Sequence, residues 1–170
     1  MEFRTPVHIA PFGFRIGHSH KGLLVGSCFA DRIGRIMRNH KLPVTVNPFG
    51  TLFNPASIAA TLKRLEERRS YDAGDLTRYE ERWISFDHHG AFDGSDCEQT
   101  LRRINEALET GAEALRTADY AILTLGTAWI YELRDTGRIV ANCHKLPAAM
   151  FRRRRMSASE IVETLGEAIT

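Results

Sequence analysis

A glycine-bounded apolar run near the start of the chain leads directly into a helical pattern. The run Gly22–Gly26 (GLLVG) is typical of a short buried strand, and apolar residues at helical spacing follow from about residue 30 to residue 40. Only the small residues around Ser27 separate the two elements. Because a strand that turns this tightly into a helix must pack against it, the pattern predicts a sheet covered by helices.

Alternating strand and helix patterns continue along the chain. We expect strands at 42–46, 83–86 and 120–125, a hairpin of 129–133 with 138–141, and helices from Pro55, over about 98–116, and after the capping box Ser157-x-x-Glu160. This order predicts one α/β domain over residues 1–170. The basic run 152–155 is predicted to be a solvated connector. Because no strand pattern follows the last helix, we expect the domain to be incomplete at its C-terminal end.

Composition excludes several functional classes. With 43% hydrophobic and 26% charged residues in 170, the chain is typical of one soluble globular domain. It has no apolar run near the roughly 20 residues of a membrane span, and its net charge of +2 gives no support for nucleic-acid binding. Residues 1–10 lack the apolar core of a secretory signal, and Cys28, Cys97 and Cys143 form no Cys-x-x-Cys pair. We expect a cytoplasmic protein without nucleic-acid or membrane partners.

Ser27 is the residue at which we expect chemistry, and two interpretations of it remain open. A helix N-terminus favours negative charge, which suits a serine that attacks an ester and generates an oxyanion. The alternative is that Gly26 serves the turn and Ser27 only caps the helix. We predict that Ser27 faces a cleft while the neighbouring Cys28 is buried in the core, because successive residues of such a corner point in opposite directions.

Six segments occur in an order that resembles a known family. They are 25–30 (VGSCFA), 46–50 (VNPFG), 54–55 (NP), 86–89 (FDHH), 125–129 (LGTAW) and 141–147 (ANCHKLP). Together they resemble the GSCFA domain family, a branch of the SGNH/GDSL-type hydrolases, over nearly the whole chain. The resemblance implies a three-layer α/β/α hydrolase of flavodoxin-like order, whose first strand lies beside the third and brings Ser27 near Gly126.

The resemblance also implies an activity. Ser27 would be the nucleophile of a serine ester hydrolase or O-acyltransferase that works through an acyl-enzyme, and its N–H and that of Gly50 would receive the oxyanion. An acylated small molecule or carbohydrate is the implied substrate, and no metal or organic cofactor is implied. Further substrate-binding candidates on the matching motifs are Asn47, His88, His89, Gly126, Thr127 and His144.

Two features of the chain depart from the superfamily pattern. Ala128 stands where a side-chain amide would supply a third oxyanion donor, so we assign that role to Asn142 in preference to Asn47. The Asp-x-x-His block that carries the catalytic acid and base is absent. Since a serine without a base is a poor nucleophile, an inactive fragment of such an enzyme is the alternative prediction.

Other candidates were weighed against plainer roles. His88 or His89 lines the cleft or substitutes for the base, or the two form an ordinary loop pair. Their spacing does not indicate a metal site, and the Gly-rich motifs of nucleotide-binding folds are absent. Trp83, Trp129 and Tyr131 are predicted to pack in the core rather than to form an aromatic wall around a substrate.

Overall fold

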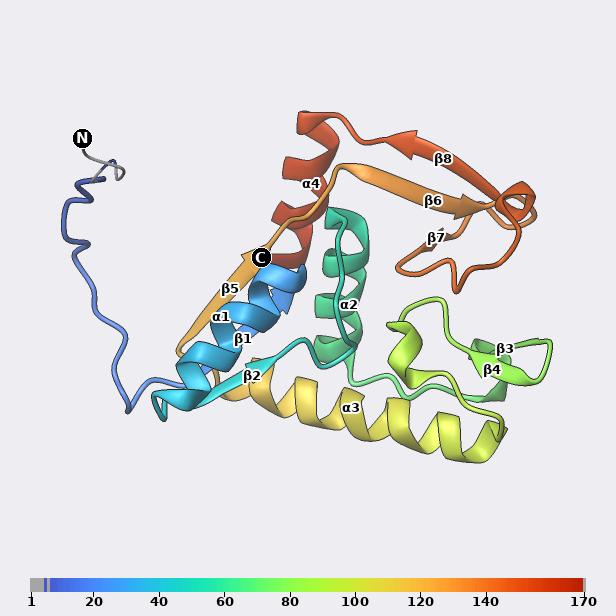
Figure 1. Ribbon diagram of the computed structural model, residues 1–170, viewed down its shortest axis with the longest axis horizontal. Helices are drawn as coiled ribbons and strands as arrows, with labels where there is room; N and C mark the ends of the chain where they lie inside the picture. The colour runs from blue at the N-terminus through green and yellow to red at the C-terminus, as the bar shows by residue number, and fades with distance from the viewer. Residues whose placement is uncertain (1–4, 6, 170) are drawn as a thin grey trace.

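A three-stranded parallel sheet forms the centre of the molecule. The computed structural model describes residue 5 and residues 7–169. In the sheet, β1 (Gly22–Gly26) lies between β2 (Val44–Val46) and β5 (Tyr120–Thr124), so the order is β2-β1-β5 (Figure 1). All of β1 is buried, and Gly26 pairs with Thr124, which aligns the carboxyl ends of β1 and β5. The resemblance led us to expect the first strand beside the strand at 120–124, and β1 and β5 do pair.

Helices cover both faces of this sheet. α1 (Cys28–Asn39) packs on one face, where Gly34 comes so close to Val46 that a Cβ would overlap it. On the other face, Leu23 and Val25 share a core with residues of α2 (Pro55–Glu67), α3 (Cys97–Thr117) and α4 (Ala158–Ile169). The described chain is therefore a mixed α/β protein. Within the described residues, no helix is both long and apolar enough to cross a membrane.

Smaller antiparallel elements flank the sheet. β3 (Thr77–Tyr79) pairs with β4 (Arg82–Ile84), and β6 (Trp129–Leu133) lies between β7 (Ile139–Val140) and β8 (Phe151–Arg155). Single-turn helices cover residues 73–75, 90–92 and 148–150. Residues 7–20 contain no helix or strand and extend away from the rest of the molecule (Figure 1).

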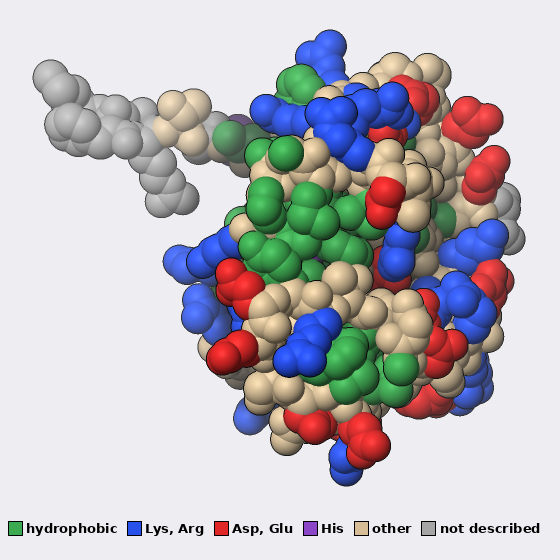
Figure 2. Space-filling model, turned by 90° about the vertical axis from the view of Figure 1, so that its right-hand side faces the viewer, with side chains coloured by type: hydrophobic (Ala, Val, Ile, Leu, Met, Phe, Trp, Pro, Cys, Tyr) green, Lys and Arg blue, Asp and Glu red, His purple; other side chains and the backbone are tan. Residues whose placement is uncertain are grey.

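The prediction of a connector at 152–155 is wrong, because these residues belong to β8 and pair with β6. Their side chains are nevertheless mostly exposed, as predicted. Glu132 of β6, only 6% exposed, holds Arg152 at 2.6 Å and Arg154 at 2.8 Å. Hydrogen bonds from Arg154 and Arg152 lower the pKa of Glu132, which therefore stays ionised and balances the basic strand. Figure 2 shows basic side chains at the top of the right-hand face, the level of β6 and β8 in Figure 1.

The aromatic residues of β6 also differ from prediction. Trp129 is 40% and Tyr131 38% exposed, and the Arg153 guanidinium lies 4.0 Å from the Trp129 ring centroid. They lie outside the core because the inward positions of β6 are taken by Ile130, Glu132 and Leu133. Trp83 is half-buried and does pack against the core that contains Phe49.

Gly34 tests the packing of α1 on the sheet. Replacing a helical glycine by alanine normally stabilises a protein by up to about 1 kcal/mol. At Gly34 we expect the opposite sign, a loss of about 1–3 kcal/mol, because the new methyl group would overlap the Val46 side chain. Urea unfolding measures this change.

Gly166→Ala in α4 is the matched control, since a Cβ there would meet no atom of the described residues within 4 Å outside its chain neighbours and the backbone of its own helix. We expect it to be neutral or stabilising. Equal stabilisation by both substitutions would contradict the close packing of α1 against β2.

Candidate active site

Ser27 lies at the carboxyl end of the central strand and is the N-cap of α1. Its Oγ lies 3.0 Å from Thr124 Oγ1 and accepts a hydrogen bond from the Phe29 N–H at 3.3 Å. Its own N–H donates to the carbonyl and hydroxyl oxygens of Thr124, at 3.0 and 2.9 Å. Ser27 is 6% exposed, so its hydroxyl is held at the edge of the core between β5 and the helix N-terminus.

Gly126 lies directly beside this serine. A Cβ at Gly126 would lie 3.3 Å from the Ser27 Cβ and 2.9 Å from the Phe53 ring. The N–H groups of Gly126 and Thr127 both donate to the Phe53 carbonyl, at 2.8 and 3.0 Å. The ends of β1 and β5 and the segment before α2 therefore meet at Ser27.

Thr124 is a partner of Ser27 that the sequence did not single out. The available signal was its position as the last residue of a buried strand, because parallel neighbours bring their carboxyl ends together. A hydroxyl at this position holds the serine side chain in place.

Asn47 braces the corner from the side of β2. Its Oδ1 accepts a hydrogen bond from the buried Gly26 N–H at 2.7 Å, and its Nδ2 donates to Asp31 Oδ1 at 2.7 Å. Thr51 donates to the second oxygen of Asp31 at 2.9 Å. The side chain of Asn47 thus connects β1, β2 and α1 immediately before Ser27.

Gly50 lies in the turn that follows Asn47. Its φ of 80° suits glycine, and a Cβ there would overlap the side chain of His89. Its N–H donates to the Asn47 carbonyl at 2.8 Å. Both backbone donors that the resemblance assigns to the oxyanion, those of Gly50 and Ser27, are therefore engaged within the protein in this conformation.

The prediction for Cys28 is wrong, since Cys28 is exposed and Ser27 is the buried member of the pair. The reason is the capping geometry. Ser27 has φ −71° and ψ 178°, and its side chain turns back to meet the Phe29 N–H and Thr124. The next residue is the first of the helix, and its thiol points outward.

His144 lies in a separate cluster with Ser85 and Asp93. Its Nε2 lies 2.8 Å from the Ser85 carbonyl oxygen, so this nitrogen carries a hydrogen and donates it. Its Nδ1 lies 3.0 Å from an oxygen of Asp93, which also contacts Arg82 at 3.4 Å. With both ring nitrogens engaged and the side chain fully buried, His144 holds the 85–93 and 141–147 loops together.

His88 is enclosed by aromatic rings. Its Nδ1 lies 2.8 Å from Ser85 Oγ, and the ring centroids of Phe49, Tyr71 and Phe92 lie 4.3–5.0 Å away. Burial, together with the charges of Arg64 and His144, lowers the pKa of His88 to about 3. This imidazole is therefore neutral near pH 7.

The remaining candidates lie beside these histidines. Asn142 Oδ1 accepts from the His144 N–H at 2.9 Å, and its Nδ2 lies 3.6 Å from where a Cβ of Gly90 would be. His89 is exposed, and its Nδ1 accepts from the Ala91 N–H. Among the described residues, no hydrogen bond joins Asn142 or any of the three histidines to Ser27.

The predicted residues thus divide into two groups. The serine corner contains Ser27, Asn47, Gly126 and Thr127, and the histidine clamp contains His88, His89, Asn142 and His144; Gly50 touches both. Burial raises the pKa of the Cys143 thiol in the clamp, which disfavours its thiolate. Across residues 7–169, no group of three or more His, Cys, Asp or Glu side chains is placed to hold a metal ion.

Comparison with protein families assigns the chain. A family model described as the GSCFA family matches residues 21–170. The chain belongs to the GSCFA family. The matched region begins one residue before β1, so it includes both the serine corner and the histidine clamp. No curated protein and no solved structure matches the chain.

Exchanging the residue types at positions 31 and 47 tests the hydrogen bond by which Asn47 braces the serine corner. Asn47→Asp removes the donor to Asp31 and sets two carboxylates against each other, so we expect a loss of about 2 kcal/mol in the free energy of unfolding. The double variant Asp31→Asn with Asn47→Asp restores one donor and one acceptor on that contact. We expect it to recover most of the loss in urea unfolding. A double variant no more stable than Asn47→Asp alone would rule out the brace.

His88 makes stability depend on pH. Its folded-state pKa of about 3 lies below the ordinary value of 6.5, so the unfolded chain takes up a proton first as the pH falls. The free energy of unfolding is therefore at its full value above about pH 6.5 and decreases as the pH falls toward 3. At pH 5 we expect it to be lower by about 2 kcal/mol. We expect His88→Gln to flatten the unfolding free energy between pH 7.5 and 5 relative to the unsubstituted protein.

The imidazole signals of His88 in nitrogen-15 NMR provide an independent measurement on the unsubstituted protein. They should remain those of a neutral ring at pH 5. A His88 that titrates near 6.5 while the protein stays folded would contradict this assignment.

Proposed function

We propose that this GSCFA-family chain acts as a serine ester hydrolase or O-acyltransferase with Ser27 as its nucleophile. The observation that carries the proposal is the position of the Ser27 hydroxyl, at the carboxyl end of the central parallel strand and at the N-terminus of α1. Ligands of open α/β sheets bind at this edge, and a helix N-terminus favours developing negative charge. The SGNH-type fold of flavodoxin-like order is part of the same proposal.

The chemistry follows from what surrounds the hydroxyl. In this proposal Ser27 Oγ attacks the ester carbonyl and its proton passes to a general base that is not among its described partners. The same base returns the proton to the departing alcohol as the acyl-enzyme forms. Water or a second alcohol then takes the acyl group. Thr124 is a positioning residue in this scheme, because its hydroxyl holds Ser27 Oγ at 3.0 Å but is itself no base. The substrate proposed is an acylated small molecule or carbohydrate, and the compartment proposed is the cytoplasm.

A second candidate is a polypeptide that has no turnover of its own. It is favoured by the hydrogen bonds of Ser27, whose described partners are Thr124 and the backbone of Phe29 rather than a histidine. Removal of the base from a serine triad typically lowers kcat by several orders of magnitude. Labelling of the serine distinguishes the two candidates.

We expect a fluorophosphonate probe to label the protein on Ser27, with the site identified by peptide mass spectrometry. Ser27→Ala should abolish labelling, whereas Cys28→Ala, which removes the exposed thiol beside it, should not. Ser27→Ala should also lower stability by about 1 kcal/mol, because it removes a helix N-cap. Thermal unfolding confirms that each variant is folded.

Equal labelling of Ser27→Ala would end the nucleophile assignment. A folded, unsubstituted protein that resists the probe would favour the candidate without turnover.

A further inference from the structure

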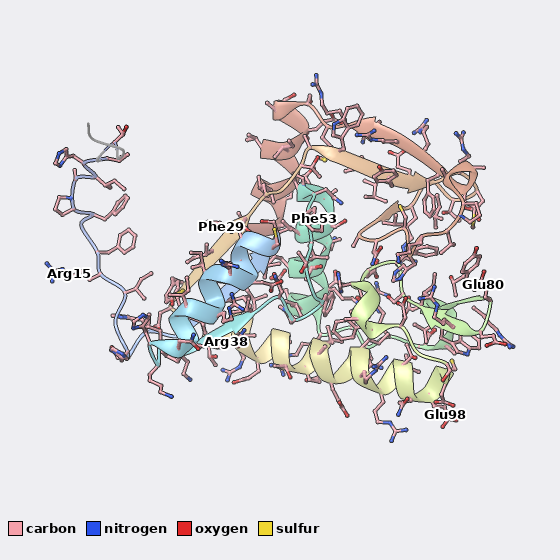
Figure 3. All side chains as sticks on the ribbon, in the orientation of Figure 1. Arg15, Phe29, Arg38, Phe53, Glu80 and Glu98 are labelled. Atoms are coloured by element: carbon pink, nitrogen blue, oxygen red, sulfur yellow. The ribbon has the colours of Figure 1, made fainter. Side chains whose placement is uncertain are left out.

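Large apolar side chains surround the serine corner and are exposed. Phe29 is 60%, Phe53 43% and Leu125 48% exposed. Figure 3 labels Phe29 at the start of α1 and Phe53 just before α2, at the same end of the two helices. Solvent-exposed apolar clusters of this kind mark binding surfaces in soluble proteins.

The three residues lie near Ser27 in the chain or in space. The Phe29 N–H donates to Ser27 Oγ, and Leu125 stands between Thr124, the hydroxyl partner of Ser27, and Gly126. The Phe53 ring and the Ser27 Cβ lie 2.9 and 3.3 Å from the same point, the position that a Cβ of Gly126 would take. The Phe53 ring is therefore next to the serine, and the exposed Phe29 and Leu125 belong to residues adjoining the same corner; the three side chains are here called the apolar rim.

Among the described residues, no charged side chain is a hydrogen-bond partner of Ser27. The side-chain partner of Ser27 is the neutral hydroxyl of Thr124, and the carboxylate on the next turn of α1, Asp31, is occupied by Asn47 and Thr51. A hydrocarbon chain needs no polar partner and would remove the rim from water.

We propose that the apolar rim of Phe29, Phe53 and Leu125 binds the acyl chain of the substrate, so that the serine acts on esters of linear acyl groups longer than acetyl. This inference rests on the proposed function, since it names the substrate class of the same site. The alcohol portion of the ester is left to the solvent side of the corner.

Two fluorophosphonates, one with an ethyl and one with an octyl tail, test the inference on the unsubstituted protein. Full burial of one methylene is worth up to about a fourfold gain in affinity, so we expect the octyl probe to label Ser27 at least about tenfold faster. Phe29→Ser and Phe53→Ser should lower the octyl rate severalfold more than the ethyl rate, so that the ratio of the two rates falls. Phe14→Ser is the matched control, because Phe14 is 69% exposed on the N-terminal segment that extends away in Figure 1.

Binding of octanamide, a neutral amide that is not turned over, gives a readout that needs no reactive serine. In ligand-observed NMR titration we expect Phe29→Ser and Phe53→Ser to weaken binding at least about fivefold, and Phe14→Ser to leave it unchanged. Octanamide that does not bind, or binds equally to all variants, overturns the acyl-chain inference even if Ser27 is labelled. If neither fluorophosphonate labels Ser27 but octanamide binds through the rim, the proposed catalytic role is overturned and the binding surface is retained.

Discussion

The peptide groups of Gly26 join the parts of the molecule on which the serine corner depends. Its N–H donates to Asn47 at 2.7 Å, and its carbonyl accepts from Leu52 at 2.8 Å, so β1 is tied at one point to the segment after β2. Its φ of 143° and the closeness of the Thr124 backbone leave no room for a side chain. Only glycine fits there, and the next residue must turn into α1 with its side chain against β5.

The family motifs divide by physical task around this point. The segment at 46–50 braces Gly26 through Asn47, while the segments at 86–89 and 141–147 form the histidine clamp. In the clamp, both ring nitrogens of His144 contact Ser85 or Asp93, whereas the neutral His88 lies among aromatic rings and its Nε2 has no hydrogen-bond partner among the described residues. His144 therefore has a structural role in the clamp, because it attaches the 85–93 and 141–147 loops to each other.

The serine corner has the opposite character, because its hydroxyl is held by a neutral partner and bordered by exposed hydrocarbon. Thr124 fixes the position of Ser27 Oγ, and Phe29, Phe53 and Leu125 expose apolar surface beside it. The clamp is polar and buried, whereas the exposed apolar rim adjoins the serine corner, and this difference is why we propose binding at the corner, where a ligand would replace water against the rim. The proposed ester substrate and its acyl chain follow from this difference.

Local pattern was enough to predict most elements. Asn54 caps α2, Ser157 and Glu160 open α4, and the glycine-bounded run Gly22–Gly26 is β1, because caps and periodicity act over a few residues. The tertiary structure decided the rest. Residues 152–155 pair with β6 as a strand, and Glu132, which is 20 and 22 residues away from Arg152 and Arg154, neutralises these two arginines. Ser27 rather than Cys28 faces inward, where its hydroxyl is hydrogen-bonded to that of Thr124, 97 residues away. Such partners meet only after the sheet forms, so no local pattern of the sequence could specify them.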